Sequence, residues 1–258
     1  MRRAGLISCL VVWLTGSCLA GETAWVDVRQ VGRFQYFSQF PLDNQRALLE
    51  ELAGLSLELQ RTLALTPSRK PIEVHLLADR DTYRQYVRAR VPGGSRRRAL
   101  FLKGPDRSYI FACRRDDWPS DLRHEAIHAL VHNSLPFLPL WLDEGLAEYF
   151  EVPLRLRHAG HPHLKRLKWS LLLGRTPSLV RLEARRGFSD LRAIDYRESW
   201  AWVHFLMHGP PTARRALRDY LAAIRTGPPP GPFSAWLEKR FPAAETALRK
   251  HLRKLQKR

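Results

Sequence analysis

The sequence predicts an α+β fold, in which a small N-terminal antiparallel or mixed sheet is followed by a helical half. Two observations support this prediction. Segments with period-two alternation or short apolar runs are confined to the first 113 residues, whereas apolar residues at helical spacing dominate after residue 119. The chain of 258 residues, 45% hydrophobic and 26% charged, also has the composition of a folded globular protein.

Four strands and two helices are predicted in the first half. Leucines at helical spacing predict a helix over 42–65, and Asp79 or Asp81 is suited to cap a short helix that carries Tyr83. Gly104-Pro105-Asp106 is a turn signal between the last two strands. The strands are predicted at 25–40, 72–77, 99–103 and 108–113.

Helices dominate the second half. Ser120 or Asp121 is suited to cap the first of them, and Pro136 ends it. A stiff proline-rich connector at 228–232 precedes a last amphipathic helix over 233–255. The helices between these two are predicted at 140–152, 164–173, 198–208 and 213–224.

The first 20 residues have the pattern of a secretory signal peptide. Two arginines precede an apolar segment at 6–14 and small residues at 17–20. Cleavage after Ala20 would release a soluble protein, whereas cleavage before Cys18 would leave a lipidated N-terminus, because residues 15–18 loosely resemble a bacterial lipobox. We therefore expect an exported protein, periplasmic or secreted, with a lipoprotein anchored at Cys18 as the alternative.

The remaining chain, 21–258, is predicted to form a single domain. It contains a strand-rich half, a helical half and a basic C-terminal helix, at 21–118, 119–227 and 233–258. Cys113 is the one cysteine outside the signal segment, so disulfides do not staple this fold. Because Cys113 lies in an apolar strand, we expect a buried thiol.

The net charge is +18, and the two arginines of the signal segment leave +16 on the mature chain. Such a surface attracts anionic partners. For an exported protein, envelope lipid and cell-wall polymers are more accessible anions than nucleic acid. The alternative is a solvated basic surface without a partner.

The strongest functional signal is His124-Glu125-Ala126-Ile127-His128. Histidines at positions i and i+4 of a helix point to the same side and can hold one Zn²⁺, with the glutamate beside the attacking water. Glu144, in a second acidic segment 16 residues after His128, is suited as a third ligand. Three ligands leave a position open for water, so the sequence predicts a zinc-dependent hydrolase with one Zn²⁺ per chain.

This motif, followed by Trp141-Leu142-Asp143-Glu144-Gly145-Leu146-Ala147-Glu148-Tyr149-Phe150, resembles the gluzincin zinc metallopeptidases, and more closely the bacterial peptidase-MA-like group. The resemblance covers most of the chain from about Phe34, and its specific part is 121–151. It implies a zincin-like fold, with His124, His128 and Glu144 as the zinc ligands. It also suggests that the strand at 109–113 binds substrate backbone by edge pairing.

The chain departs from the family at the third ligand. Fifteen residues separate His128 from Glu144, fewer than in typical gluzincin aminopeptidases, whereas Glu148, one turn later, lies at nearly the usual distance. We favour Glu144, because the surrounding sequence matches there; Glu148 is then suited to orient a ligand histidine, and the two roles are exchangeable. His132, one turn after His128, is interpreted as a helix-surface or orienting residue.

In the expected mechanism, the zinc polarises a peptide carbonyl and Glu125 passes a proton from water to the leaving amine. Tyr196 is the candidate donor to the developing oxyanion, with a packing role as its alternative. Endopeptidase action is the default, because the chain lacks a Gly-x-Met-Glu-Asn-type exopeptidase block. Two other functions are retained: amide hydrolysis in cell-wall material, and a basic envelope-binding module with an idle or structural zinc site.

Two further histidine groups receive structural interpretations. His204 and His208 are also four residues apart, but no acidic helix accompanies them, so we predict packing or capping roles in preference to a second metal site. His158, His161 and His163 lie in an irregular segment; loose metal binding is the alternative there, and a solvated loop is the simpler interpretation.

Overall fold

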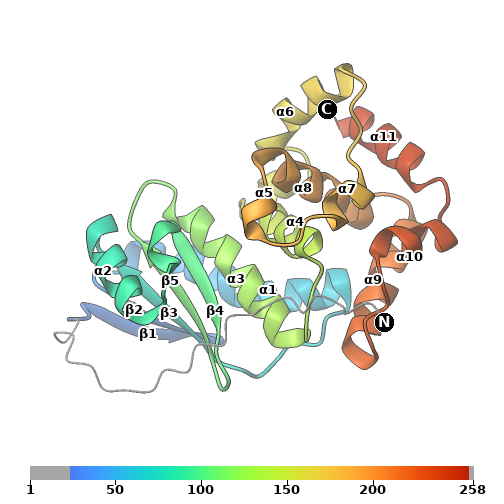
Figure 1. Cartoon of the computed structure of the whole chain (residues 1–258). Coiled ribbons are helices and arrows are strands. Elements are labelled where there is room, and N and C mark those ends of the chain that lie inside the picture. Colours follow the sequence, from blue (N-terminus) through green and yellow to red (C-terminus); the bar gives the residue numbers. More distant parts are fainter. Residues whose placement is uncertain (1–23, 256–258) are drawn as a thin grey trace. The chain divides into compact units, whose positions relative to one another are not determined.

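The computed structural model describes residues 24–255, so the predicted signal peptide at 1–20, with Cys18, lies outside the described residues. The α+β prediction is confirmed: a five-stranded mixed sheet precedes a helical half (Figure 1). None of the helices between residues 24 and 255 combines the length and the hydropathy that a membrane crossing requires.

The five strands lie side by side in the order β1-β2-β3-β5-β4. The pairs β1–β2 and β4–β5 are antiparallel, whereas β2–β3 and β3–β5 are parallel. Three of the strands coincide with the predicted ones, at 72–77, 99–103 and 108–113. The bounds are β1 Asp27–Val31, β2 Phe34–Ser38, β3 Ile72–Leu77, β4 Ala99–Lys103 and β5 Ser108–Cys113.

Two expectations about the sheet are wrong. The segment 25–40 is not one strand but a hairpin, which turns at Gly32 with φ +61°, in the left-handed region that favours glycine. The strand at 109–113 is not an edge, because β5 lies between β3 and β4. The edge on this side of the sheet is β4. The chain turns after Lys103, and β5 then runs antiparallel to β4.

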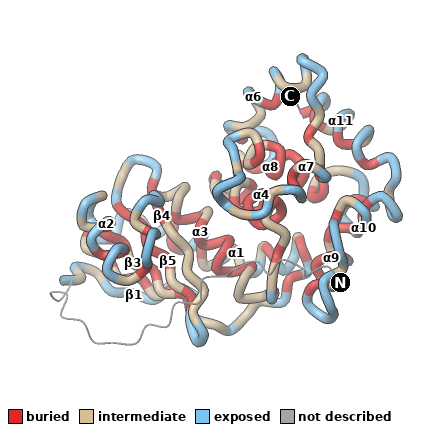
Figure 2. Tube along the Cα trace, in the orientation of Figure 1, coloured by how far each residue is buried: buried red, intermediate tan, exposed pale blue. Residues whose placement is uncertain are grey.

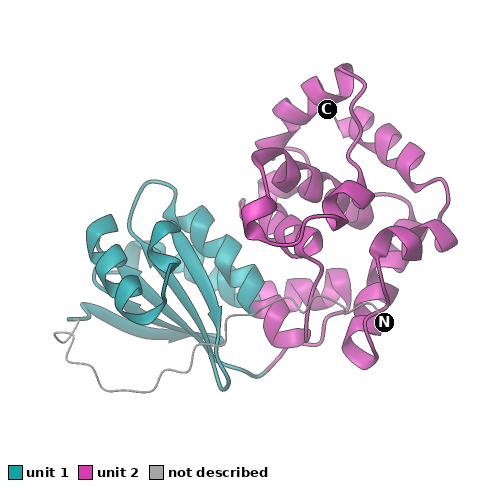
Figure 3. Cartoon of the chain, in the orientation of Figure 1, with its two compact units in different colours: residues 1–54, 69–129 teal, residues 55–68, 130–258 magenta. Residues whose placement is uncertain are grey.

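The chain forms two compact units (Figure 3). Unit 1 comprises residues 1–54 and 69–129, and unit 2 comprises residues 55–68 and 130–258. Two of the three boundaries fall inside helices, within α1 (Arg46–Leu63) and within α3 (Trp118–Ser134), and the third lies between residues 68 and 69, after α1. The prediction of a single domain over 21–258 stays a prediction.

In unit 1, helix α2 (Arg80–Arg90) packs against the sheet. The Asp79 carboxylate caps this helix by accepting hydrogen bonds from the N–H groups of Asp81 and Thr82, each at 2.9 Å. Cys113 is a free, buried cysteine as predicted, and burial raises the pKa of its thiol. The buried cluster between helix and sheet contains Leu77, Tyr83, Tyr86, Val87, Val91, Phe111 and Cys113.

Unit 2 is built around helix α8, whose residues from Glu198 to Phe205 are all buried (Figure 2). Trp200 and Trp202 are fully buried in its centre. Helices α4, α9 and α11 contact α8. The bounds are α4 Leu140–Phe150, α5 Leu154–Arg157, α6 His163–Leu172, α7 Leu179–Glu183, α8 Ala193–His208, α9 Pro211–Thr226, α10 Phe233–Arg240 and α11 Ala244–Leu255.

Several helix ends differ from the predicted ones. Helix α3 begins at Trp118, so Ser120 and Asp121 lie in its first turn, where Pro119 fits because its missing N–H needs no partner there. Helix α8 begins five residues earlier than predicted, since the Asp195 carboxylate accepts the N–H of Arg192 at 2.9 Å. The predicted helix over 233–255 is two helices, separated at Phe241 and Pro242.

Candidate functional site

Helix α3 carries the three residues of the predicted zinc motif that lie in unit 1. The imidazole rings of His124 and His128 have centroids 4.9 Å apart, as residues one helical turn apart on one face should. His128 is 7% exposed, and its ring stacks on Phe101 of β4 with centroids 6.3 Å apart. The zinc helix therefore runs beside the edge strand of the sheet (Figure 1).

Glu125 lies on the same helix with 9% of its surface exposed. It is electrostatically coupled to Tyr83 of α2: burial raises the pKa of the Tyr83 phenol, and the Glu125 carboxylate raises it further. The carboxylate predicted to act as general base is thus held where little water reaches it.

Helix α4 carries Glu144 and Glu148 in unit 2. Glu144 is 3% exposed. The glycine after it lets α4 approach α8 closely, because a Cβ at Gly145 would lie 2.7 Å from the carbonyl oxygen of Ser199. Trp141 is 1% exposed and packs against Phe233, with ring centroids 5.5 Å apart. Trp141 and Gly145 thus pack α4, the helix that carries Glu144, against α8 and Phe233.

A hydrogen bond joins the last turn of α3 to the first turn of α4 within unit 2. Nε2 of His132 lies 2.8 Å from Oδ2 of Asp143, and both side chains are largely buried. His132, predicted as a helix-surface or orienting residue, therefore binds the residue next to Glu144. The sequence did not predict Asp143 as the partner of His132, because only the turn between α3 and α4 brings these two positions together.

The predicted ligands belong to different units. His124 and His128 lie in unit 1, and Glu144 and Glu148 lie in unit 2, while α3 itself continues across the boundary after Ala129. The assignment of His124, His128 and Glu144 as zinc ligands stays a prediction.

Glu148 contacts two histidines that the sequence placed in a solvated loop. Its carboxylate oxygen Oε2 lies 2.6 Å from Nε2 of His163, and its carbonyl oxygen lies 2.9 Å from Nε2 of His161. His161 is 2% exposed and stacks on Trp200, with centroids 4.7 Å apart. The prediction of a solvated loop is wrong for these two residues, because the segment folds back onto α4 and α8. The role predicted for Glu148, orienting a zinc-ligand histidine, stays a prediction.

Acid should destabilise the protein through His161. Its ring is neutral in the folded chain: Nε2–H donates to the Glu148 carbonyl, and Nδ1 accepts from the N–H of His163 at 3.2 Å. Burial, and then the nearby His163, lower the pKa of His161 from 6.5 to about 4. Below pH 6.5 the unfolded chain takes up a proton that the folded chain refuses, so stability falls until about pH 4.

The expected loss from this one residue is roughly 2 kcal/mol between pH 7.5 and pH 5, at about 1.4 kcal/mol per pH unit. It is measured by urea unfolding, with EDTA present, of the wild type and His161→Gln, whose amide can still donate to the Glu148 carbonyl. The stability of the wild type should fall more steeply with acid than that of the variant. Parallel profiles would contradict the assignment.

Tyr196, the predicted oxyanion donor, is half-buried in the first turn of α8. The neighbouring Asp195 anchors this turn. Burial raises the pKa of the Asp195 carboxyl, but hydrogen bonds from the Arg192 N–H and from the Arg181 and Arg185 guanidinium groups hold it below its ordinary value. Tyr196 therefore projects from a firmly held helix start, and its catalytic role stays a prediction.

No protein-family model matches the chain, and a search of curated proteins found no match to it. The resemblance to gluzincin peptidases therefore depends on the residues of 121–151 themselves.

Proposed function

We propose that this protein is an exported zinc-dependent peptidase of the gluzincin type, with His124, His128 and Glu144 as ligands of one Zn²⁺ and Glu125 as general base. The observation that carries the proposal is the placement of His124, Glu125 and His128 on one helix, with the two imidazoles on one face beside the sheet edge. Zinc at two histidines and a carboxylate supplies Lewis acidity and lowers the pKa of bound water.

The contact between His132 and Asp143 supports Glu144 as the third ligand. His132 lies one turn after His128 on α3, and residues four apart on a helix share a face. Asp143, its partner at 2.8 Å, directly precedes Glu144 on α4. Glu144 is buried on the same helix, and a carboxylate oxygen is a common third ligand of Zn²⁺ beside two histidines.

A peptide substrate is proposed to bind along β4. Since β4 is the edge strand beside His128, an extended peptide can add to the sheet through backbone hydrogen bonds. Its scissile carbonyl would then lie near the two histidines. Glu125, on the same helix, takes a proton from the attacking water and transfers it to the leaving amine. Tyr196 is proposed to donate to the oxyanion.

Zinc content tests the ligand assignment. Purified mature protein should contain about one Zn²⁺ bound at this site per chain, and His124→Ala should lose it. Glu144→Ala should lose this zinc as completely as His124→Ala, whereas Glu148→Ala should retain most of it, because its carboxylate binds His163. Elemental analysis after dialysis provides the measurement. If Glu148→Ala loses this zinc and Glu144→Ala retains it, Glu148 is the third ligand and Glu144 is not.

A basic surface feature favours a second candidate function, binding to an anionic envelope surface. A cleft of about 400 Å³ in unit 1 is lined by four arginines from α2 and the loop after it. These residues are Arg80, Arg84, Arg88 and Arg96. Salt-sensitive binding of anionic vesicles or wall polymer by zinc-free protein, lost when the four arginines become glutamines, would support this function. The alternative substrate, an amide in cell-wall material, is separated from peptide by assaying both with the same enzyme.

A further inference from the structure

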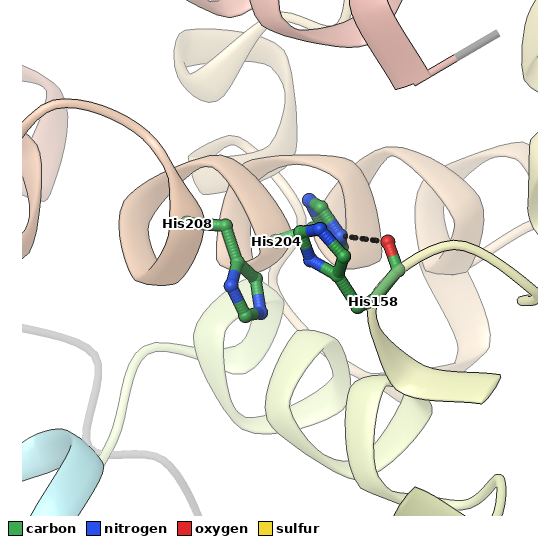
Figure 4. A group of neighbouring side chains, drawn as sticks. All are labelled: His158, His204 and His208. Carbon is green, nitrogen blue, oxygen red and sulfur yellow. Dashed lines mark hydrogen bonds between the residues drawn. The ribbon is translucent and has the colours of Figure 1, made fainter. Parts of the chain in front are cut away.

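The end of helix α8 holds a second concentration of histidines, all in unit 2. His204 and His208 project from adjacent turns of α8, and His158 follows helix α5 (Figure 4). The ring centroids of His204 and His208 are 4.7 Å apart, and those of His158 and His208 are 4.8 Å apart. One ring nitrogen from each of the three histidines lies within 4.8 Å of the others.

We infer that His158, His204 and His208 form a second metal site, which binds Zn²⁺ through three imidazoles and is independent of the proposed peptidase site. Imidazole nitrogen is a favoured ligand of Zn²⁺. In a tetrahedral site with Zn–N bonds of about 2.1 Å, ligand nitrogens are about 3.4 Å apart, so the cluster needs only a modest contraction. His158 is exposed and at a helix end, where its ring can make this adjustment.

His204 is arranged to release a nitrogen to the metal. Its Nε2–H donates to the carbonyl oxygen of His158 at 2.9 Å (Figure 4). Its Nδ1 lies 2.9 Å from Nε2 of His251 on α11. For Nε2 to bind the metal, its proton would move to Nδ1 and be donated to His251. The His158 carbonyl, which faces Nε2, would have to turn away as the His158 segment adjusts. The ligand histidine thus has a hydrogen-bond partner in either tautomer.

His208 has a comparable arrangement. Its Nε2 lies 2.7 Å from the hydroxyl of Tyr149 on α4; this hydroxyl can accept a hydrogen bond from the Nε2–H group, which leaves Nδ1 for the metal. The prediction of packing roles for His204 and His208 omitted His158, which is distant in sequence.

Zinc counts in matched variants test this site. In the His124→Ala background, which removes the proposed peptidase site, the mature chain should still bind about one Zn²⁺. Adding His158→Gln should reduce this to less than about one tenth, although the His158 carbonyl that accepts from His204 remains. Adding His75→Gln instead, a histidine of unit 1 bonded to Tyr86 at 2.7 Å, should change nothing. Zn²⁺ should raise the Tm of the His124→Ala protein and of the variant that adds His75→Gln. It should not raise the Tm of the variant that adds His158→Gln.

The outcomes separate the two sites. A His124→Ala protein that binds no Zn²⁺ on titration would overturn the second site, and so would a count unaffected by His158→Gln. If His158→Gln alone removes one Zn²⁺ while His124→Ala removes none, the second site stands and the proposed peptidase site fails.

Discussion

Replacing Glu125 with glutamine should abolish peptide hydrolysis while leaving the zinc content unchanged. The substitution keeps the size and hydrogen-bonding capacity of the side chain, but the amide cannot take a proton from the attacking water. Loss of a general base costs roughly 100- to 10,000-fold in rate. The measurement is turnover of a peptide library by the zinc-loaded protein, with elemental analysis of the same samples. Because Glu125 is 9% exposed, circular dichroism and Tm are recorded to verify that the variant is folded.

The matched control is Glu245→Gln. Glu245 is an exposed residue in the first turn of α11, so its replacement makes the same change in charge away from the zinc motif. It should hydrolyse the library at the wild-type rate. Unchanged hydrolysis by Glu125→Gln would refute the general-base role. Zinc-loaded wild-type protein that cleaves no peptide but cleaves wall amides would redirect the proposal to the amidase function.

Local sequence signals predicted much of the fold. The strands at 72–77, 99–103 and 108–113 coincide with β3, β4 and β5, because each is a short run bounded by turn-forming residues. The hairpin at Gly32 was missed because the alternation continues on both sides of the turn. The order of the strands was beyond sequence reasoning, so β5 was mistaken for an edge. Neighbours in a sheet are chosen by long-range packing, which no local pattern contains.

At the candidate site, too, the local sequence predicted some features and left others out. The spacing of His124 and His128 predicted their common helical face, which the rings 4.9 Å apart confirm. The contacts of His132 with Asp143, and of His163 with Glu148, join residues 11 and 15 positions apart across turns. The burial of His161 likewise depends on Trp200, from a different helix. Residues within one helix were therefore predictable, and their partners on other elements were not.

The largest effect on stability is expected at Arg157, a buried arginine whose burial the sequence does not signal. Its side chain is 2% exposed and lies in unit 2. Nη1 contacts both carboxylate oxygens of Glu58, at 2.7 and 2.6 Å, and Nε donates to the carbonyl of Val152 at 3.1 Å. The guanidinium also lies 4.9 Å from the centre of the Phe150 ring. Glu58 is thus an anionic partner of a cation that has almost no access to water.

Glu58→Ala should lower the free energy of unfolding by about 3 kcal/mol, the lower end of the range for breaking a buried ion pair, because Glu58 itself is 28% exposed and water can enter. The measurement is urea unfolding near neutral pH. Glu50→Ala is the control: it lies on the same helix α1, and its pair with Arg46 is exposed, so its loss should have a much smaller effect than that of Glu58→Ala. Equal effects of the two substitutions would contradict the prediction.

A double variant separates the cost of removing one member of the pair from the value of the pair itself. In Glu58→Leu with Arg157→Leu, both charges of the pair are replaced by apolar side chains. Because such replacements of buried ion pairs are often neutral or stabilising, the double variant should recover most of the stability that Glu58→Ala loses. If it is instead less stable than Glu58→Ala, the hydrogen bonds of Arg157 hold the α5 segment to the rest of unit 2, and the penalty for removing one member of the pair is the smaller contribution.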